Sequence, residues 1–139
     1  MASGVYKNAI GAILKGNIDL ENAVINCVLL TSDYTPDLDS DISLTDIPED
    51  AIVSDATLTG KIINSDNEFK ASDSTFLSVV AGKEVIAAVL YLDAETYGDS
   101  TLIVFFDNAP EFPLTTDGSD ITVKYDPNGI GILKATRKP

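Results

Sequence analysis

The chain has 139 residues, a formal net charge of −13 at pH 7, 45% hydrophobic residues, no histidine, no tryptophan and one cysteine. This length predicts a single domain, residues 1–139, that buries a hydrophobic core without a disulfide or a structural metal. The absence of histidine removes the commonest general base and the commonest zinc ligand. Nine basic residues against 22 acidic ones predict a surface that repels phosphate and anionic lipid, so we expect no nucleic-acid and no membrane partner.

The start of the chain does not resemble a targeting segment. The apolar stretch after Lys7 is short and is interrupted by Asn8, Gly11 and Lys15, which is not the pattern of a signal peptide. No apolar run approaches the roughly 20 residues that span a bilayer. We therefore expect a protein that is made in the cytosol and is not anchored.

Residues 4–15 carry the only clear helical pattern. Ser3 is the predicted N-cap and Gly16 the predicted stop. A helix of this length is marginal in water by itself, so we expect it to pack over its own sheet, or alternatively to dock on a neighbouring subunit. The predicted apolar stripe consists of Tyr6, Ala9, Ile10, Ile13 and Leu14, and the opposite polar face of Lys7, Asn8, Gly11 and Lys15.

Short strands are predicted after Gly16. Residues 23–31 form a nearly continuous apolar run, typical of a strand covered on both faces, one of them by the helix. Residues 84–93 and 101–106 are separated by a short polar turn, which predicts a hairpin. The other predicted strands are residues 52–63 with an interruption at Gly60, then 68–71, 76–80, 121–125 and 130–135, the last after a turn at 126–129 and before a frayed basic end at 134–139.

One helix followed by about seven short, regularly spaced strands is typical of all-β domains. The predicted fold class is therefore mainly β, a β-sandwich or jelly-roll-like domain with one short N-terminal α-helix.

Residues 33–50 contain seven acidic residues and two prolines. This composition predicts a long surface loop, with one helical turn near residues 40–45. Loops of this length inside a compact domain are usually functional or loosely ordered.

The spacing of Asp37, Asp39 and Asp41 imitates the first half of a calcium loop. An EF-hand needs glycine at its sixth position and a bidentate glutamate at its twelfth, and this chain has Ile42 and Pro48 there. The EF-hand interpretation therefore fails. A looser Ca²⁺ site and a merely solvated charged loop both stay open.

The residues offer no arrangement for catalysis. Ser–His–Asp and Cys–His pairs are impossible without histidine, and Cys27 lies within the apolar run, as an inert core thiol would. Gly129-Ile-Gly131 enters a strand and lacks the third glycine of a nucleotide-binding loop. We expect no catalytic residues, no metal site and no cofactor.

Two segments together resemble a known family. The first contains Leu14-Lys-Gly-Asn-Ile-Asp-Leu20 and Leu29-Leu-Thr-Ser-Asp-Tyr-Thr-Pro-Asp37, and the second is Ile121-Thr-Val-Lys-Tyr-Asp-Pro-Asn-Gly-Ile130. Between them, Asp73-Ser-Thr-Phe76 precedes an apolar strand. In this order the chain resembles small structural proteins of tailed bacteriophages that are encoded among head and tail genes.

The resemblance spans most of the chain and is close only up to Asp37. Family members tend to carry a Gly-Tyr-Thr-type segment where this chain has Ser54-Asp-Ala-Thr-Leu-Thr-Gly60, and tryptophan where it has Phe76.

The resemblance implies a non-enzymatic virion protein, made in the host cytoplasm and assembled into the particle. The leading expectation is a capsid decoration or cement protein that bridges subunits of the major capsid protein from outside, where acidic charge is kept away from packaged DNA. A tail-associated or fibre-type protein for host adsorption is the alternative, and an enzyme with a carboxylate mechanism is a third hypothesis. Other virion proteins are possible partners, and we expect a homo-oligomer, for example a trimer.

The contact elements that we expect are the N-terminal helix and the acidic loop. The candidate interface residues are Tyr6, Ile10 and Ile13 on the helix and Tyr34 at the start of residues 34–50.

Overall fold

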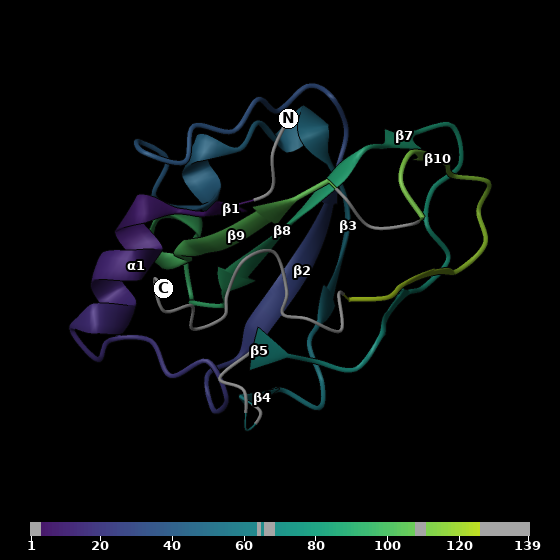
Figure 1. Cartoon of the computed structure of the whole chain (residues 1–139). Coiled ribbons are helices and arrows are strands. Elements are labelled where there is room, and N and C mark those ends of the chain that lie inside the picture. Colours follow the sequence, from purple (N-terminus) through teal and green to yellow (C-terminus); the bar gives the residue numbers. More distant parts are fainter. Residues whose placement is uncertain (1–3, 64, 66–68, 108–110, 126–139) are drawn as a thin grey trace, which may run out of the picture.

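The computed structural model describes residues 4–63, 65, 69–107 and 111–125. At its centre is one five-stranded antiparallel sheet (Figure 1). The strands follow one another across this sheet in the order β1 (Gly4–Val5), β9 (Leu102–Phe106), β8 (Ala87–Leu92), β2 (Ile25–Leu30) and β3 (Ile52–Thr57).

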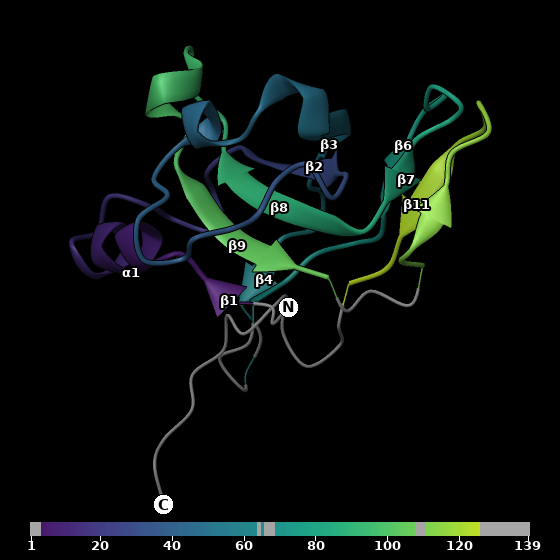
Figure 2. The ribbon, with the colours of Figure 1, turned by 90° about the horizontal axis from the view of Figure 1, so that it is seen from above.

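Three two-stranded antiparallel pairs complete the described strands. They are β4 (Ile62–Ile63) with β5 (Phe69–Lys70), β6 (Ser74–Phe76) with β11 (Ile121–Val123), and β7 (Glu84–Val85) with β10 (Leu114–Thr115). Figure 2 shows β6, β7 and β11 at one end of the central sheet and helix α1 (Lys7–Leu14) at the other. The protein is mainly β, with a β-sandwich-like domain and a short N-terminal helix, which confirms the predicted fold class.

Both faces of the central sheet are covered. Phe105 and Phe106 are neighbours in β9, so their side chains point to opposite faces. The ring of Phe105 packs against Tyr34, with centroids 6.4 Å apart. Phe106 lies 6.2 Å from Phe112 and 5.9 Å from Tyr125. All residues of β2 are buried, as predicted for a strand enclosed from both sides.

Helix α1 begins later than predicted. We expected a helix from residue 4, but Gly4 and Val5 form β1 and pair with Phe105 and Val104. Tyr6 then precedes the helix in an extended conformation, and its N–H donates to the carbonyl of Ile103 at 2.9 Å. The sheet edge thus satisfies backbone groups that a longer helix would have bonded internally. The predicted N-cap, Ser3, lies outside the described residues.

The helix ends where glycine was predicted to stop it. Gly16 has a φ of +79°. Its N–H donates to the carbonyl of Ile13 at 3.0 Å, and that of Asn17 donates to Ala12 at 2.8 Å. These two bonds are the Schellman pattern, which requires a left-handed residue that is usually glycine.

Replacing Gly16 with alanine is expected to lower the free energy of unfolding by about 1 kcal/mol, because a Cβ is strained at this positive φ. The same substitution at Gly11 is the matched control. Gly11 lies within α1 with open space where its Cβ would stand, so alanine should raise stability by about 0.5–1 kcal/mol there. Urea unfolding measures both changes. If both alanine variants changed the free energy of unfolding in the same direction, this account of the helix end would be contradicted.

Two predicted strands are wrong in extent. Residues 76–80 were expected to be one strand, but β6 ends at Phe76 and Ser78 has a φ of +46°. Residues 84–93 were also expected to be continuous, yet they form β7 and β8. The reason is that β7 pairs with β10, while β8 pairs with β2 and β9. The two parts of residues 84–93 therefore belong to different sheets.

The other predicted strands are present where the structure describes them, although the one expected at residues 121–125 ends at Val123. The interruption at Gly60 separates β3 from β4, and β8 and β9 pair directly as an antiparallel hairpin. The predicted turn at 126–129, the strand at 130–135 and the basic end at 134–139 lie outside the described residues.

Candidate functional site

Helix α1 and the acidic segment, which are the two expected contact elements, lie side by side. The N–H of Lys7 donates to the carbonyl of Leu38 at 2.8 Å. A second hydrogen bond joins the phenol oxygens of Tyr6 and Tyr34, which are 2.7 Å apart. Residues far apart in the sequence therefore form one continuous surface, which we call the helix–loop face and define as α1 with residues 37–46.

Tyr34 is the central link of this face. Its hydroxyl donates to Oδ2 of Asp41 at 2.7 Å, so it accepts the hydrogen bond from the hydroxyl of Tyr6. Tyr6 has no exposed surface and Tyr34 has 5%. Burial raises the pKa of both phenols above the ordinary tyrosine value, so both stay neutral at pH 7 and keep their donors.

The acidic side chains of residues 37–46 organise their own backbone. Asp37 Oδ1 accepts from the N–H groups of Asp39 and Ser40, both at 3.1 Å, while Asp41 Oδ2 accepts from the N–H of Asp37 at 3.0 Å. Asp46 closes a capping box with Ser43. Such side-chain to backbone bonds are typical of Asx turns. The segment is therefore an ordered loop in which the carboxylates of Asp37, Asp41 and Asp46 have structural roles.

This loop contains more regular structure than the single helical turn that we predicted near residues 40–45. It has two 3-10 turns, at Leu44–Asp46 and Glu49–Ala51. Within the described part of the chain, no three acidic or cysteine side chains gather as a metal site would require. A Ca²⁺ site in this loop stays a hypothesis without structural support.

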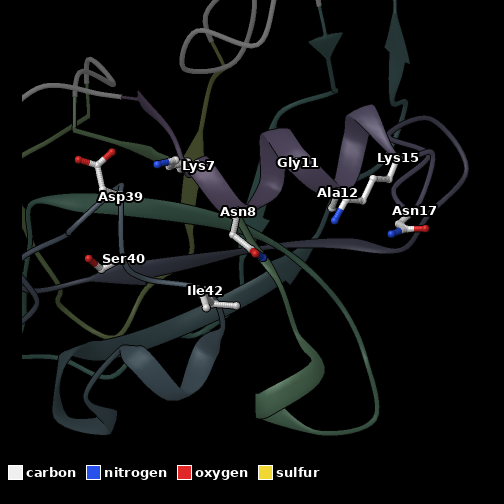
Figure 3. Close-up of a pocket in the computed structure, with 9 residues that line it drawn as sticks. All are labelled: Lys7, Asn8, Gly11, Ala12, Lys15, Asn17, Asp39, Ser40 and Ile42. Atoms are coloured by element: carbon white, nitrogen blue, oxygen red, sulfur yellow. The ribbon is translucent and has the colours of Figure 1, made fainter.

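A groove of about 510 Å³ separates α1 from the loop (Figure 3). Its helix side is the predicted polar face together with Ala12, and its loop side carries one large apolar side chain, Ile42, which is 50% exposed. Figure 3 shows Asn8 and Ile42 facing each other across its middle, with Lys7 and Asp39 toward one end and Lys15 and Asn17 toward the other. The lining residues are Lys7, Asn8, Gly11, Ala12, Lys15, Asn17, Asp39, Ser40 and Ile42.

The four candidate interface residues differ in their exposure. Ile10 is 46% exposed and Ile13 is half-buried, while Tyr6 and Tyr34 are buried. A partner on the helix–loop face would touch Ile10 directly. Tyr6 and Tyr34 would contribute only by holding the helix and the loop together.

Sequence reasoning missed two features of this face. The first is the exposure of Leu14, which we had placed in the apolar stripe of the helix and which is 82% exposed. Leu14 lies one helical turn from Ile10, so the two side chains form an exposed apolar pair in the described structure. The groove was also missed. Its helix half was visible as the polar face of residues 4–15, but nothing in the sequence placed Asp39, Ser40 and Ile42 opposite that face.

Cys27 occupies the core position that was expected for it. The side chain is fully buried, and this burial raises the pKa of the thiol to about 12. The thiol is therefore protonated at neutral pH and is a poor nucleophile.

No protein-family model matches the chain, and a search of curated proteins finds no match. None of the helices that the structure describes has the length and apolar character needed to cross a bilayer. The resemblance to bacteriophage structural proteins therefore stays a prediction based on the quoted segments.

Proposed function

We propose that this protein is a non-enzymatic component of a tailed-phage virion, a decoration or cement protein that attaches to the outside of the capsid and bridges neighbouring subunits. The observation that carries the proposal is the role of the segments that resemble the phage family. Residues 14–20 and 29–37 include the end of α1, the link to β2 and the start of the acidic loop. Leu14 and Asp37 belong to the helix–loop face itself, and the other residues of these segments connect its two sides to the central sheet.

Individual residues of these segments have identifiable structural tasks. Asp19 accepts hydrogen bonds from the backbone N–H groups of Glu21 and Asn22 and from the amide of Asn22, which fixes the link after the helix. Tyr34 ties the loop to the helix through Tyr6 and Asp41. These hydrogen bonds support the proposal, because residues of the resembling segments hold the helix–loop face in place, and attachment to a lattice needs a fixed surface.

Composition and exposure support attachment from outside. A net charge of −13 is unfavourable next to packaged DNA. Ile10 and Leu14 offer apolar area for a contact that is modest for each copy, and many copies on one particle add their effects. A homo-oligomer would multiply such contacts in the same way.

Co-sedimentation with undecorated phage capsids tests the proposal. We expect the protein to pellet with capsids at a stoichiometry that matches the lattice. Changing Ile10 and Leu14 together to aspartate should weaken binding by about tenfold or more, because two exposed apolar side chains lose their contact area. The matched control changes Leu77 and Val80, which are 72% and 69% exposed, in the same way and should bind like the wild type.

Binding to host cells with none to capsids would favour the alternative, a tail-associated or fibre-type protein. One observation supports that alternative. Leu77 and Val80 are presented on the turn after β6, which is held by a 2.7 Å hydrogen bond from the N–H of Ser78 to Asp120 Oδ1. An adsorption protein that uses loops at this end would lose cell binding in the Leu77 and Val80 variant and keep it in the Ile10 and Leu14 variant. Hydrolysis of a glycan panel, abolished by one aspartate substitution, would overturn both.

A further inference from the structure

The groove between α1 and the acidic loop concentrates positive charge in an acidic protein. Lys7 and Lys15 line it, although the chain has only nine basic residues against 22 acidic ones. Neither ammonium group forms an ion pair with any residue that the structure describes. Two lysines and one aspartate, Asp39, line the groove, so its charged side chains are net positive in a protein of net charge −13. A carboxylate from outside would be attracted to them.

Neutral polar groups of the groove are also available. The side chains of Asn8, Asn17 and Ser40 make no hydrogen bond within the described part of the chain. Their amides and hydroxyl provide both donors and acceptors, as the backbone of a bound peptide requires. Ile42, which is 50% exposed on the loop side, adds an apolar contact for a side chain.

Gly11 leaves the helix side of the groove open. It lies within α1 and lines the groove, and a Cβ built on it would meet no atom within 4 Å. Glycine is unfavourable within a helix compared with alanine, and no neighbouring atom explains it here. Its effect is to let another chain approach the helix backbone between the two lysines.

The spacing of the lysines suggests the form of the ligand. Lys7, Gly11 and Lys15 follow one another at intervals of four and share one side of the helix. Eight residues at about 1.5 Å each separate the lysines by about 12 Å along the axis. An extended chain rises about 3.3 Å per residue, so two acidic residues four positions apart span about the same length.

We propose that this groove binds an extended acidic segment of a partner protein, with one carboxylate at Lys7 and another, four residues away, at Lys15. The inference rests on the proposed attachment to a virion, in which this segment would belong to the capsid protein. Asp39, at the Lys7 end of the groove (Figure 3), would disfavour a third acidic residue there and so limit the partners that the groove accepts.

Titration of the ¹⁵N-labelled protein with short acetylated, amidated peptides tests the groove directly by NMR. The probes are extended Ala/Thr/Ile peptides with two glutamates two, four or six positions apart. We expect chemical-shift changes at residues 7–17 and 39–42, and the tightest binding for the spacing of four. Lys7→Gln with Lys15→Gln should weaken that binding about tenfold. Gly11→Leu should block it by filling the groove.

The matched control is Lys83→Gln with Lys124→Gln, which makes the same charge change at two exposed lysines outside the groove. Circular dichroism of each variant confirms that the fold is kept. No shifts in the groove at millimolar peptide, no preference for the spacing of four, or equal loss in the control would overturn the inference.

Capsid co-sedimentation of the same variants separates the two proposals. Wild-type protein that pellets while the Gly11→Leu and Lys7/Lys15 variants do not supports both. Pelleting of all variants alike would overturn the groove as the attachment point and leave the proposed function standing. Peptide binding in the groove without pelleting of the wild type would contradict the proposed function alone.

Discussion

Replacing Phe106 with alanine is expected to lower the free energy of unfolding by about 3–5 kcal/mol, the usual range for removing a buried phenylalanine. Phe106 lies in β9 with 3% exposure, and its ring packs against Phe112 and Tyr125 with centroid distances of 6.2 and 5.9 Å. Phe112 and Tyr125 both belong to the segment after β9. Phe106 therefore holds that segment against one face of the central sheet. Urea denaturation at pH 7 measures the change.

Two controls accompany this variant. Phe106→Leu keeps most of the buried volume and should cost clearly less than the alanine variant. Leu77→Ala removes a side chain that is 72% exposed, and should change stability by no more than about 0.5 kcal/mol. A loss below about 1 kcal/mol for Phe106→Ala would show that this aromatic cluster does not hold the segment after β9 against the central sheet.

Tyr34→Phe is expected to lower the free energy of unfolding by about 1–3 kcal/mol and to loosen the helix–loop face. The lost hydroxyl donates to Asp41 and accepts from Tyr6. Its removal therefore leaves the hydroxyl of Tyr6, which has no exposed surface, without its partner, at the cost of an unsatisfied buried donor. Denaturation gives the energy, and amide hydrogen exchange at residues 37–42 should become faster than in the wild type.

Tyr6→Phe is the matched control. It removes the other hydroxyl of the pair but leaves the bond from Tyr34 to Asp41 intact, so we expect a smaller loss of about 0.5–1.5 kcal/mol. The double variant should lose less than the sum of the two, because both single changes remove the same bond. Two results would contradict the role of the Tyr6, Tyr34 and Asp41 hydrogen bonds as the link between helix and loop. One is additive losses in the free energy of unfolding, and the other is unchanged amide hydrogen exchange at residues 37–42 in Tyr34→Phe.

Local patterns predicted the features that depend on local chemistry. The run of apolar residues at 23–31 became β2, which is buried on both faces, because a strand enclosed from two sides keeps both of its faces away from water. Gly16 ended the helix because its backbone adopts the left-handed conformation. The hairpin of β8 and β9 followed from a short polar turn between two apolar segments.

Local patterns failed where pairing partners come from distant parts of the chain. Gly4 and Val5 match a helical pattern, yet they form β1 because their backbone pairs with the free edge of β9. The apolar run of residues 84–93 was divided because β10 and the central sheet each took one half. Spacing along the chain carries no information about which edge a strand will find.

For the helix–loop face, composition and spacing established a polar helix face, an acidic loop and the glycine at the end of the helix. The folded chain alone made Tyr6 and Tyr34 a buried pair, turned Ile10 and Leu14 outward and set Ile42 across from Asn8. The physical reason is that burial and contact depend on how the helix is rotated against β9 and on where the loop crosses it. Both are set by bonds between residues about 30 positions apart, such as those from Lys7 to Leu38 and from Tyr6 to Tyr34.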